Sequence, residues 1–199
     1  MKKLHRSDLY CWSRFDVERN IDFNGILWVN PNGNIIIDPV PLEDYDKKHL
    51  KSLGGAKYII ITNSDHVRDA KNILSFTGAK CFGPTGEKNF FPIKCDYWLK
   101  DGDKPISGIE VFSLKGSKTS GELAIIIEKS TLITGDLIRS DRGGKLNMLP
   151  DEKLINRDLA IESIRRIASI KEIEAVIPGD GWPIFSYGHE ALLQLSKQI

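Results

Sequence analysis

With 199 residues and a hydrophobic share of 41%, the chain is long enough to bury one sizeable core, and we expect a single domain over residues 1–199. Acidic and basic residues nearly balance at a net charge of +1 without a basic cluster, which argues against nucleic-acid binding. The longest apolar runs are far too short to span a membrane, and the charged N-terminus lacks the apolar core of a signal peptide.

The cysteines indicate a reducing compartment. Cys11, Cys81 and Cys95 are odd in number and far apart in sequence, so neither a disulfide framework nor a Cys-x-x-Cys metal motif is present. We therefore expect reduced thiols and a cytoplasmic location.

The first half of the chain predicts strands and two helices. Two β-rich runs, residues 25–29 and 34–37, flank Asn32-Gly33, a pair typical of a hairpin. A helix is expected at 42–53, and the apolar run 58–62 suits a strand buried on both faces. A second helix follows from the spacing of Val67, Ala70, Ile73 and Leu74, and ends at Gly78.

The second half continues with strands and two more helices. Residues 81–100 are rich in Phe, Pro and Gly and predict loop with one short strand. Strands are then expected at 109–114, 123–128, 131–134 and 174–177, and helices at 156–170 and 189–198. Because strands follow one another directly in both halves, the order favours an α/β (α+β) sandwich of two mixed sheets with external helices over a doubly wound sheet.

Four polar residues follow closely on apolar runs: Asp65, His66, Asp136 and Asp180. Strand ends are where such folds present ligands, and three carboxylates with one imidazole would suit one hard or borderline metal ion. Each also has a structural interpretation. Asp65 could cap a helix, His66 could be an ordinary surface or core histidine, Asp136 could end a strand, and Asp180-Gly181 is a common turn pair.

Five segments, taken in order, resemble the metallo-β-lactamase superfamily. Residues 61–66 (Ile-Thr-Asn-Ser-Asp-His) resemble its His-x-His-x-Asp-His loop, and 118–121 (Lys-Thr-Ser-Gly) its His-Thr-x-Gly segment. Residues 132–136 resemble the strand that ends in the bridging aspartate, 178–181 (Pro-Gly-Asp-Gly) the final Pro-Gly-His-Gly loop, and 35–39 the early strand that ends in Asp-Pro. The resemblance implies a four-layer αββα sandwich.

The resemblance also implies that half of the family's two-metal centre is lost. The three histidines of the first metal site correspond to Ile61, Asn63 and Lys118, none of which suits a metal ion. The ligands of the second site correspond to residues that can all coordinate, namely Asp65, His66, Asp136 and Asp180. We therefore expect one divalent metal ion (Zn, Mn or Fe) or none.

The function implied by this pattern is that of a single-metal hydrolase of an ester, lactone, thioester or phosphoester. Asp65 and Asp136 would be catalytic, and Asn63 and Lys118 would contact a small-molecule substrate. A β-lactam is not expected, because the first-site histidines are absent. The alternative is a non-catalytic family member that binds a small ligand or a protein partner; a homodimer is also left open.

Lys118 has further interpretations. Its ammonium could replace the first metal ion and pair with Asp136, or it could be an ordinary solvated lysine. A Ser-Lys nucleophile built with Ser117 or Ser120 has no oxyanion motif to support it. Trp182 and Phe185 either line the mouth of a pocket or belong to the core.

Overall fold

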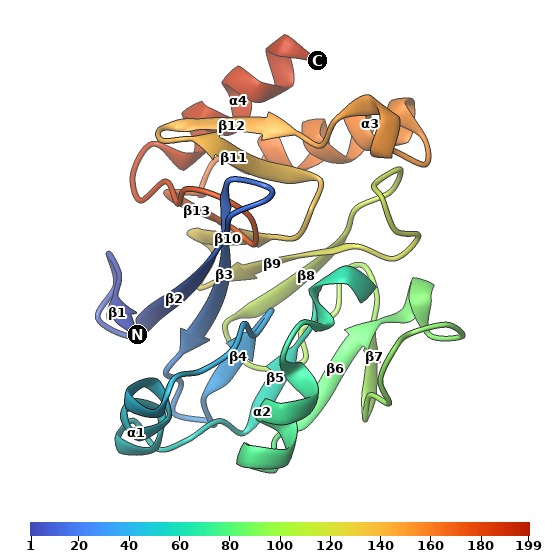
Figure 1. Cartoon of the computed structure of the whole chain (residues 1–199). Helices are drawn as coiled ribbons and strands as arrows, with labels where there is room; N and C mark the ends of the chain where they lie inside the picture. Colours follow the sequence, from blue (N-terminus) through green and yellow to red (C-terminus); the bar gives the residue numbers. More distant parts are fainter.

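A computed structural model describes residues 1–199 and shows two sheets packed face to face with helices on both outer sides (Figure 1). The first sheet has the order β1-β2-β3-β4-β5-β6-β7 and the second the order β13-β10-β9-β8, while β11 and β12 form a separate hairpin. The strands are β1 Lys2–Lys3, β2 Leu9–Asp16, β3 Ile21–Trp28, β4 Ile35–Ile37, β5 Tyr58–Ile60, β6 Lys80–Pro84, β7 Tyr97–Leu99, β8 Ile109–Ser113, β9 Leu123–Ile127, β10 Thr131–Thr134, β11 Ile138–Arg142, β12 Lys145–Met148 and β13 Ala175–Pro178.

Four helices complete the outer layers. Helices α1 and α2 cover the first sheet, and α3 and α4 cover the second (Figure 1). Their bounds are α1 Asp44–Ser52, α2 Ala70–Thr77, α3 Arg157–Ala168 and α4 Gly188–Gln198. None of the helices is both long enough and apolar enough to cross a membrane.

Three apolar clusters lie between the four layers. One fills the space between the sheets and includes Ile60 and Ile133, and the other two lie between each sheet and its helices. Successive strand residues alternate between clusters: Ile60 faces the opposite sheet, while Ile59 faces the helices. The expected αββα sandwich is therefore confirmed, and the run from Tyr58 is apolar on both faces because both faces are covered.

Both sheets are mixed, and this brings particular strand ends together. Strand β4 pairs in parallel with β5, and β10 pairs in parallel with β13. The segments that leave these four strands carry the residues singled out in the sequence. Parallel neighbours end at the same edge of a sheet, so these segments gather at one edge of the sandwich.

The expected elements are largely present, with a few differences. The hairpin around Asn32-Gly33 joins β3 to β4 as expected, and Asn156 caps α3 by accepting a hydrogen bond from the Leu159 amide at 3.0 Å. The segment 81–100 contains two strands, not one. Strand β2 and the hairpin β11–β12 were not expected, because their polar and apolar residues show no clean alternation in sequence.

Candidate metal site

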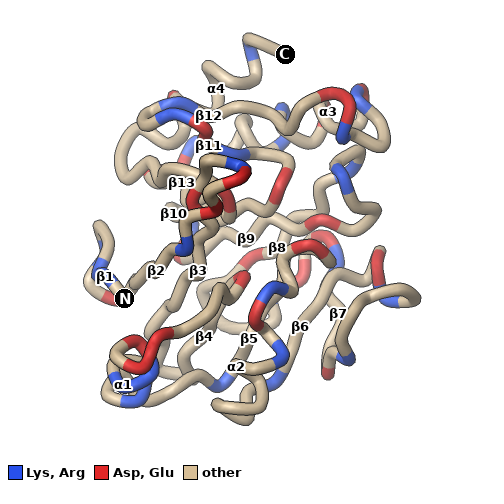
Figure 2. The backbone as a smooth tube through the Cα atoms, in the orientation of Figure 1, with Lys and Arg blue, Asp and Glu red and all other residues tan.

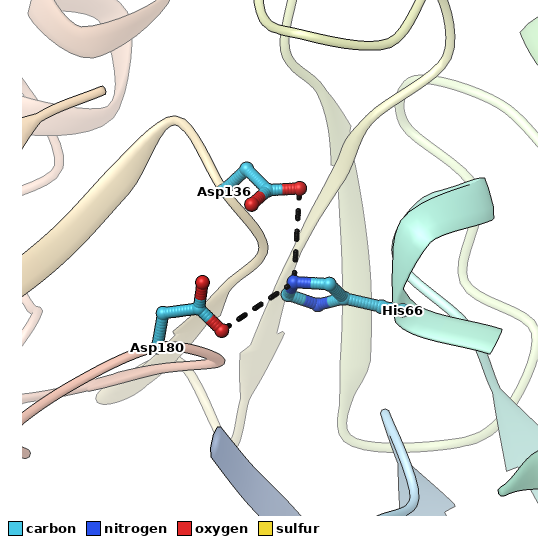
Figure 3. A group of neighbouring side chains, drawn as sticks. All are labelled: His66, Asp136 and Asp180. Atoms are coloured by element: carbon cyan, nitrogen blue, oxygen red, sulfur yellow. Dashed lines mark ion pairs between the residues drawn. The ribbon is translucent and has the colours of Figure 1, made fainter. Parts of the chain in front are cut away.

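His66, Asp136 and Asp180 converge at the edge where β5, β10 and β13 end (Figure 3). The Nε2 atom of His66 lies 3.7 Å from Asp136 Oδ2 and 3.7 Å from Asp180 Oδ1. All three side chains are buried, and their potential ligand atoms lie within 4.8 Å of one another. The distances exceed those of hydrogen bonds, so the three groups surround a common point without bonding directly to each other.

Asp38 orients the His66 ring. The fully buried Asp38 carboxylate accepts a hydrogen bond from His66 Nδ1 at 2.7 Å, and others from the amide and hydroxyl of Thr62 at 2.8 and 2.6 Å. This leaves Nε2 to face Asp136 and Asp180. A carboxylate on the distal nitrogen is the usual support of a metal-binding histidine.

Asn63 holds both the loop and Asp136. Its side-chain oxygen accepts hydrogen bonds from the amides of Asp65 and His66, each at 3.0 Å, and its Nδ2 donates to Asp136 Oδ2 at 3.0 Å. Asn63 is fully buried, so these contacts fix the geometry of the site from behind. Its expected contact with substrate stays a prediction.

Asp65 does not join the three converging residues. Its side chain is 43% exposed and forms an ion pair with Lys118, whose side chain is 36% exposed. The lysine ammonium therefore pairs with Asp65, and the direct ion pair with Asp136 considered from the sequence is not formed. Asp65 and Lys118 are thus partly accessible to solvent, whereas Asp136 and Asp180 are buried.

Arg68, which the sequence patterns did not single out, reaches into the site. Its Nη2 donates to Asp180 Oδ1 at 2.6 Å and lies 3.1 Å from His66 Nε2. Only its position two residues beyond His66, in the segment after β5, could have drawn attention to it. Asp38 had a clearer signal, since it ends a buried strand directly before proline.

The electrostatics couple these groups. Burial and the Arg68 guanidinium lower the pKa of His66, but the carboxylates of Asp38 and Asp136 outweigh them and raise it to about 10. Burial alone would raise the pKa of Asp136, yet His66, Lys118 and Arg68 hold it well below its usual range. Asp136 is therefore ionised at every physiological pH.

Glu122 lies behind the site and has the opposite tendency. Burial and the nearby Asp136 charge raise the pKa of Glu122 to about 8, although Ser117 Oγ donates to it at 2.5 Å and the Leu137 amide at 2.9 Å. Acidic and basic positions are interleaved along the whole chain (Figure 2).

The three converging residues fit a single divalent ion. Ligands at about 2.1 Å in a tetrahedron lie about 3.4 Å apart, close to the two 3.7 Å separations from His66 Nε2. One imidazole and two carboxylates suit zinc, manganese or iron. Arg68 Nη2 contacts two of the same ligand atoms, so an ion would have to take its place.

A cavity of about 750 Å³ adjoins the loop that carries Asp180. Gly181, Trp182 and Phe185 from that loop line it, together with Asn24 and residues near the N-terminus. Trp182 is 57% and Phe185 42% exposed, so they belong to a pocket wall and not to the core.

The αββα sandwich with a His-Asp-Asp group at one sheet edge defines the class of metallo-β-lactamase-like proteins. A family model described as the metallo-beta-lactamase superfamily matches residues 1–199. The chain therefore belongs to the metallo-β-lactamase superfamily. No curated protein matches it.

Solved structures share the fold at low sequence identity. The DIM-1 metallo-beta-lactamase is 18% identical, with 98% of this chain and 96% of that one covered and a TM-score of 0.76. A metallo-beta-lactamase from Pontibacter korlensis is 15% identical, with 98% and 97% covered and a TM-score of 0.74. TTHA1623, described in a di-iron-bound form, is 18% identical, with 92% and 96% covered and a TM-score of 0.73. At these identities the likeness shows the fold alone.

Proposed function

We propose that this protein binds one divalent metal ion through His66, Asp136 and Asp180 and hydrolyses an ester, lactone, thioester or phosphoester. The observation that carries the proposal is the convergence of the three buried ligand atoms around one point, with His66 oriented by Asp38. A bound ion would polarise the scissile group and lower the pKa of a water molecule.

The chain's own residues supply the remaining functions. Asp136 stays ionised, because the positive groups around it lower its pKa, and Asn63 fixes one of its oxygens. We assign proton acceptance from water to the accessible Asp65 carboxylate, and binding of a negatively charged part of the substrate to Lys118 beside it; their partial exposure supports both roles. The cavity with Trp182 and Phe185 is not lined by the ligand residues themselves, but it adjoins Gly181 next to Asp180, and we assign it to the body of a small substrate.

A β-lactam is not the substrate that we propose. The positions of the first-site histidines hold Ile61, Asn63 and Lys118. Ile61 and Asn63 are fully buried, and the Lys118 ammonium pairs with Asp65. A second ion, which many family members use, has no ligands here.

The test is to purify the protein without chelator and measure bound metal by elemental analysis. About one equivalent is expected, and Asp180→Asn should lose it while Asp65→Asn keeps it, because Asp65 lies outside the ligand group. The same proteins are then assayed against panels of nitrophenyl esters, lactones, thioesters and phosphodiesters. Protein that remains metal-free after incubation with zinc, manganese and iron(II) would refute the proposal.

A second candidate is a non-catalytic protein that binds a small ligand. The ion pairs of Arg68 with Asp180 and of Lys118 with Asp65 favour it, because they balance the acidic residues without an ion. Ligand binding without turnover on any of the panels, in protein that carries no metal, would support this candidate over the hydrolase.

A further inference from the structure

The Arg68 guanidinium contacts the same atoms that a metal ion would use. Nη2 donates to Asp180 Oδ1 at 2.6 Å and lies 3.1 Å from His66 Nε2. A metal ion bound to these two atoms and the guanidinium would occupy overlapping positions, and two positive charges at such a short distance repel each other. The two cations therefore exclude each other.

The position of Arg68 is strongly determined by its surroundings. Nη1 donates to the main-chain oxygen of Asn24 at 3.0 Å, Nη2 lies 3.2 Å from that of Gly179, and the guanidinium stacks 5.0 Å from the centre of the Phe23 ring. The side chain is only 11% exposed. These partners come from β3 and from the segment after β13, so the guanidinium links both sheets at the site.

The backbone of Arg68 shows that this placement opposes the residue's own preference. Its φ of 43° and ψ of −114° lie in a region that side chains other than glycine rarely adopt. Such conformations persist only where the surroundings enforce them, and they concentrate at functional sites.

We propose that Arg68 is an internal cation that competes with the metal ion for His66 and Asp180, so that the metal ion binds only when the guanidinium swings out. This inference rests on the proposed function, since it assumes that His66, Asp136 and Asp180 form the metal site. The metal-free protein is then a stable, correctly folded state in which the guanidinium balances the negative charge of the ligands. The affinity for the metal ion is then lower than the three ligands would give without Arg68. Once released, the guanidinium can pair with an anionic substrate.

The direct test compares metal affinity in wild type, Arg68→Ala and Arg68→Gly. Arg139→Ala is the matched control, because it removes a guanidinium of the same charge near the site. Arg139 Nη1 lies 3.9 Å from Asp180 Oδ2, which is beyond hydrogen-bond distance, and Arg139 does not contact His66. Zinc and manganese affinities are measured by competition with a chromogenic chelator, and Co²⁺ absorption reports the ligand geometry. Loss of Arg68 should tighten binding about ten- to a hundredfold, the equivalent of one charged hydrogen bond, and loss of Arg139 much less.

A second measurement keeps the inference testable if Arg68→Ala is unstable. Free guanidinium ion at millimolar concentration, below the denaturing range, should occupy the vacated position in Arg68→Gly and weaken metal binding competitively. Urea, its neutral analogue, should not. The wild type should show neither effect, because its own guanidinium already fills the place.

The outcomes separate the two proposals. If neither wild type nor the Arg68 variants bind metal, the proposed function fails. If the wild type binds metal and the Arg68 variants bind it no more tightly, the metal site stands and the competition is refuted. Tighter binding in the Arg68 variants, reversed by guanidinium and not by urea, supports both.

Discussion

Replacing Asp38 by alanine tests whether the site depends on one buried carboxylate. Asp38 is fully buried and accepts three hydrogen bonds of 2.6 to 2.8 Å, two from Thr62 and one from His66. Hydrogen bonds to a charged group contribute about 1.5–3 kcal/mol each, and they are not fully additive when the partners adjoin. Asp38 also has a φ of 48°, which an aspartate tolerates better than an alanine.

Together these losses predict that Asp38→Ala lowers the free energy of unfolding by about 3–6 kcal/mol, a large part of the 5–15 kcal/mol typical of a folded domain. The assay is urea unfolding followed by fluorescence and circular dichroism. Asp44→Ala is the matched control, since that side chain is 91% exposed, and it should change the free energy by no more than about 1 kcal/mol, the contribution of an acidic residue in the first turn of a helix. A loss below about 1 kcal/mol for Asp38→Ala would refute the reasoning.

Asp38→Asn separates stability from metal binding. Asparagine tolerates the positive φ and can still accept from Thr62, so the protein should fold. It cannot offer His66 a negative charge, and metal affinity should fall about ten- to a hundredfold. An unchanged metal affinity would show that Asp38 does not support the ligand through His66.

Three further predictions concern the surroundings of the site. Because the pKa of Glu122 is raised to about 8, the folded chain keeps a proton between pH 4.5 and 8 that the unfolded chain has lost, so the free energy of unfolding falls as pH rises through this window. In urea unfolding, the free energy of unfolding of Glu122→Gln should increase by about 1 kcal/mol or more relative to that of wild type between pH 5 and pH 9. A difference that stays constant over this range would contradict the prediction. Gly179→Ala would place a methyl group 2.5 Å from His66 Cε1, so we expect weaker metal binding in the chelator competition assay and a lower Tm, whereas wild-type values would show that the ring can move aside. The buried thiols of Cys81 and Cys95 lie 3.1 Å apart, so treatment with a disulfide oxidant should link them, as mass spectrometry of unreduced peptides would show, and Cys11 should remain free.

The fold was predictable because a strand that is buried on both faces consists of an uninterrupted run of apolar residues. Ile59 and Ile60 need no alternation with polar residues, since a helix layer covers one and the second sheet the other. Strand β2 was not predicted, because its first half is buried on both faces while residues of its second half alternate between partly buried and exposed positions. Neither a continuous apolar run nor a regular alternation therefore extends over the whole strand.

The candidate site was predictable in its positions and not in its side-chain directions. The sequence places Asp65 and His66 side by side after β5, and the resemblance assigns both to one metal. In the structure they lie in a short 3-10 turn, where consecutive side chains point about 120° apart. His66 therefore faces Asp136 and Asp180, while Asp65 turns toward Lys118.

The sequence by itself determined the family, the sandwich and the strand ends that carry the polar residues, because apolar patterning and motif order are local properties of the chain. Only the tertiary structure decided which of these residues meet. Arg68 reaches Asp180 across 112 positions of sequence, from a backbone conformation that no local preference favours. A buried cluster of carboxylates needs positive charge from some source, and only the packing of the two sheets shows that an arginine of the same chain supplies it.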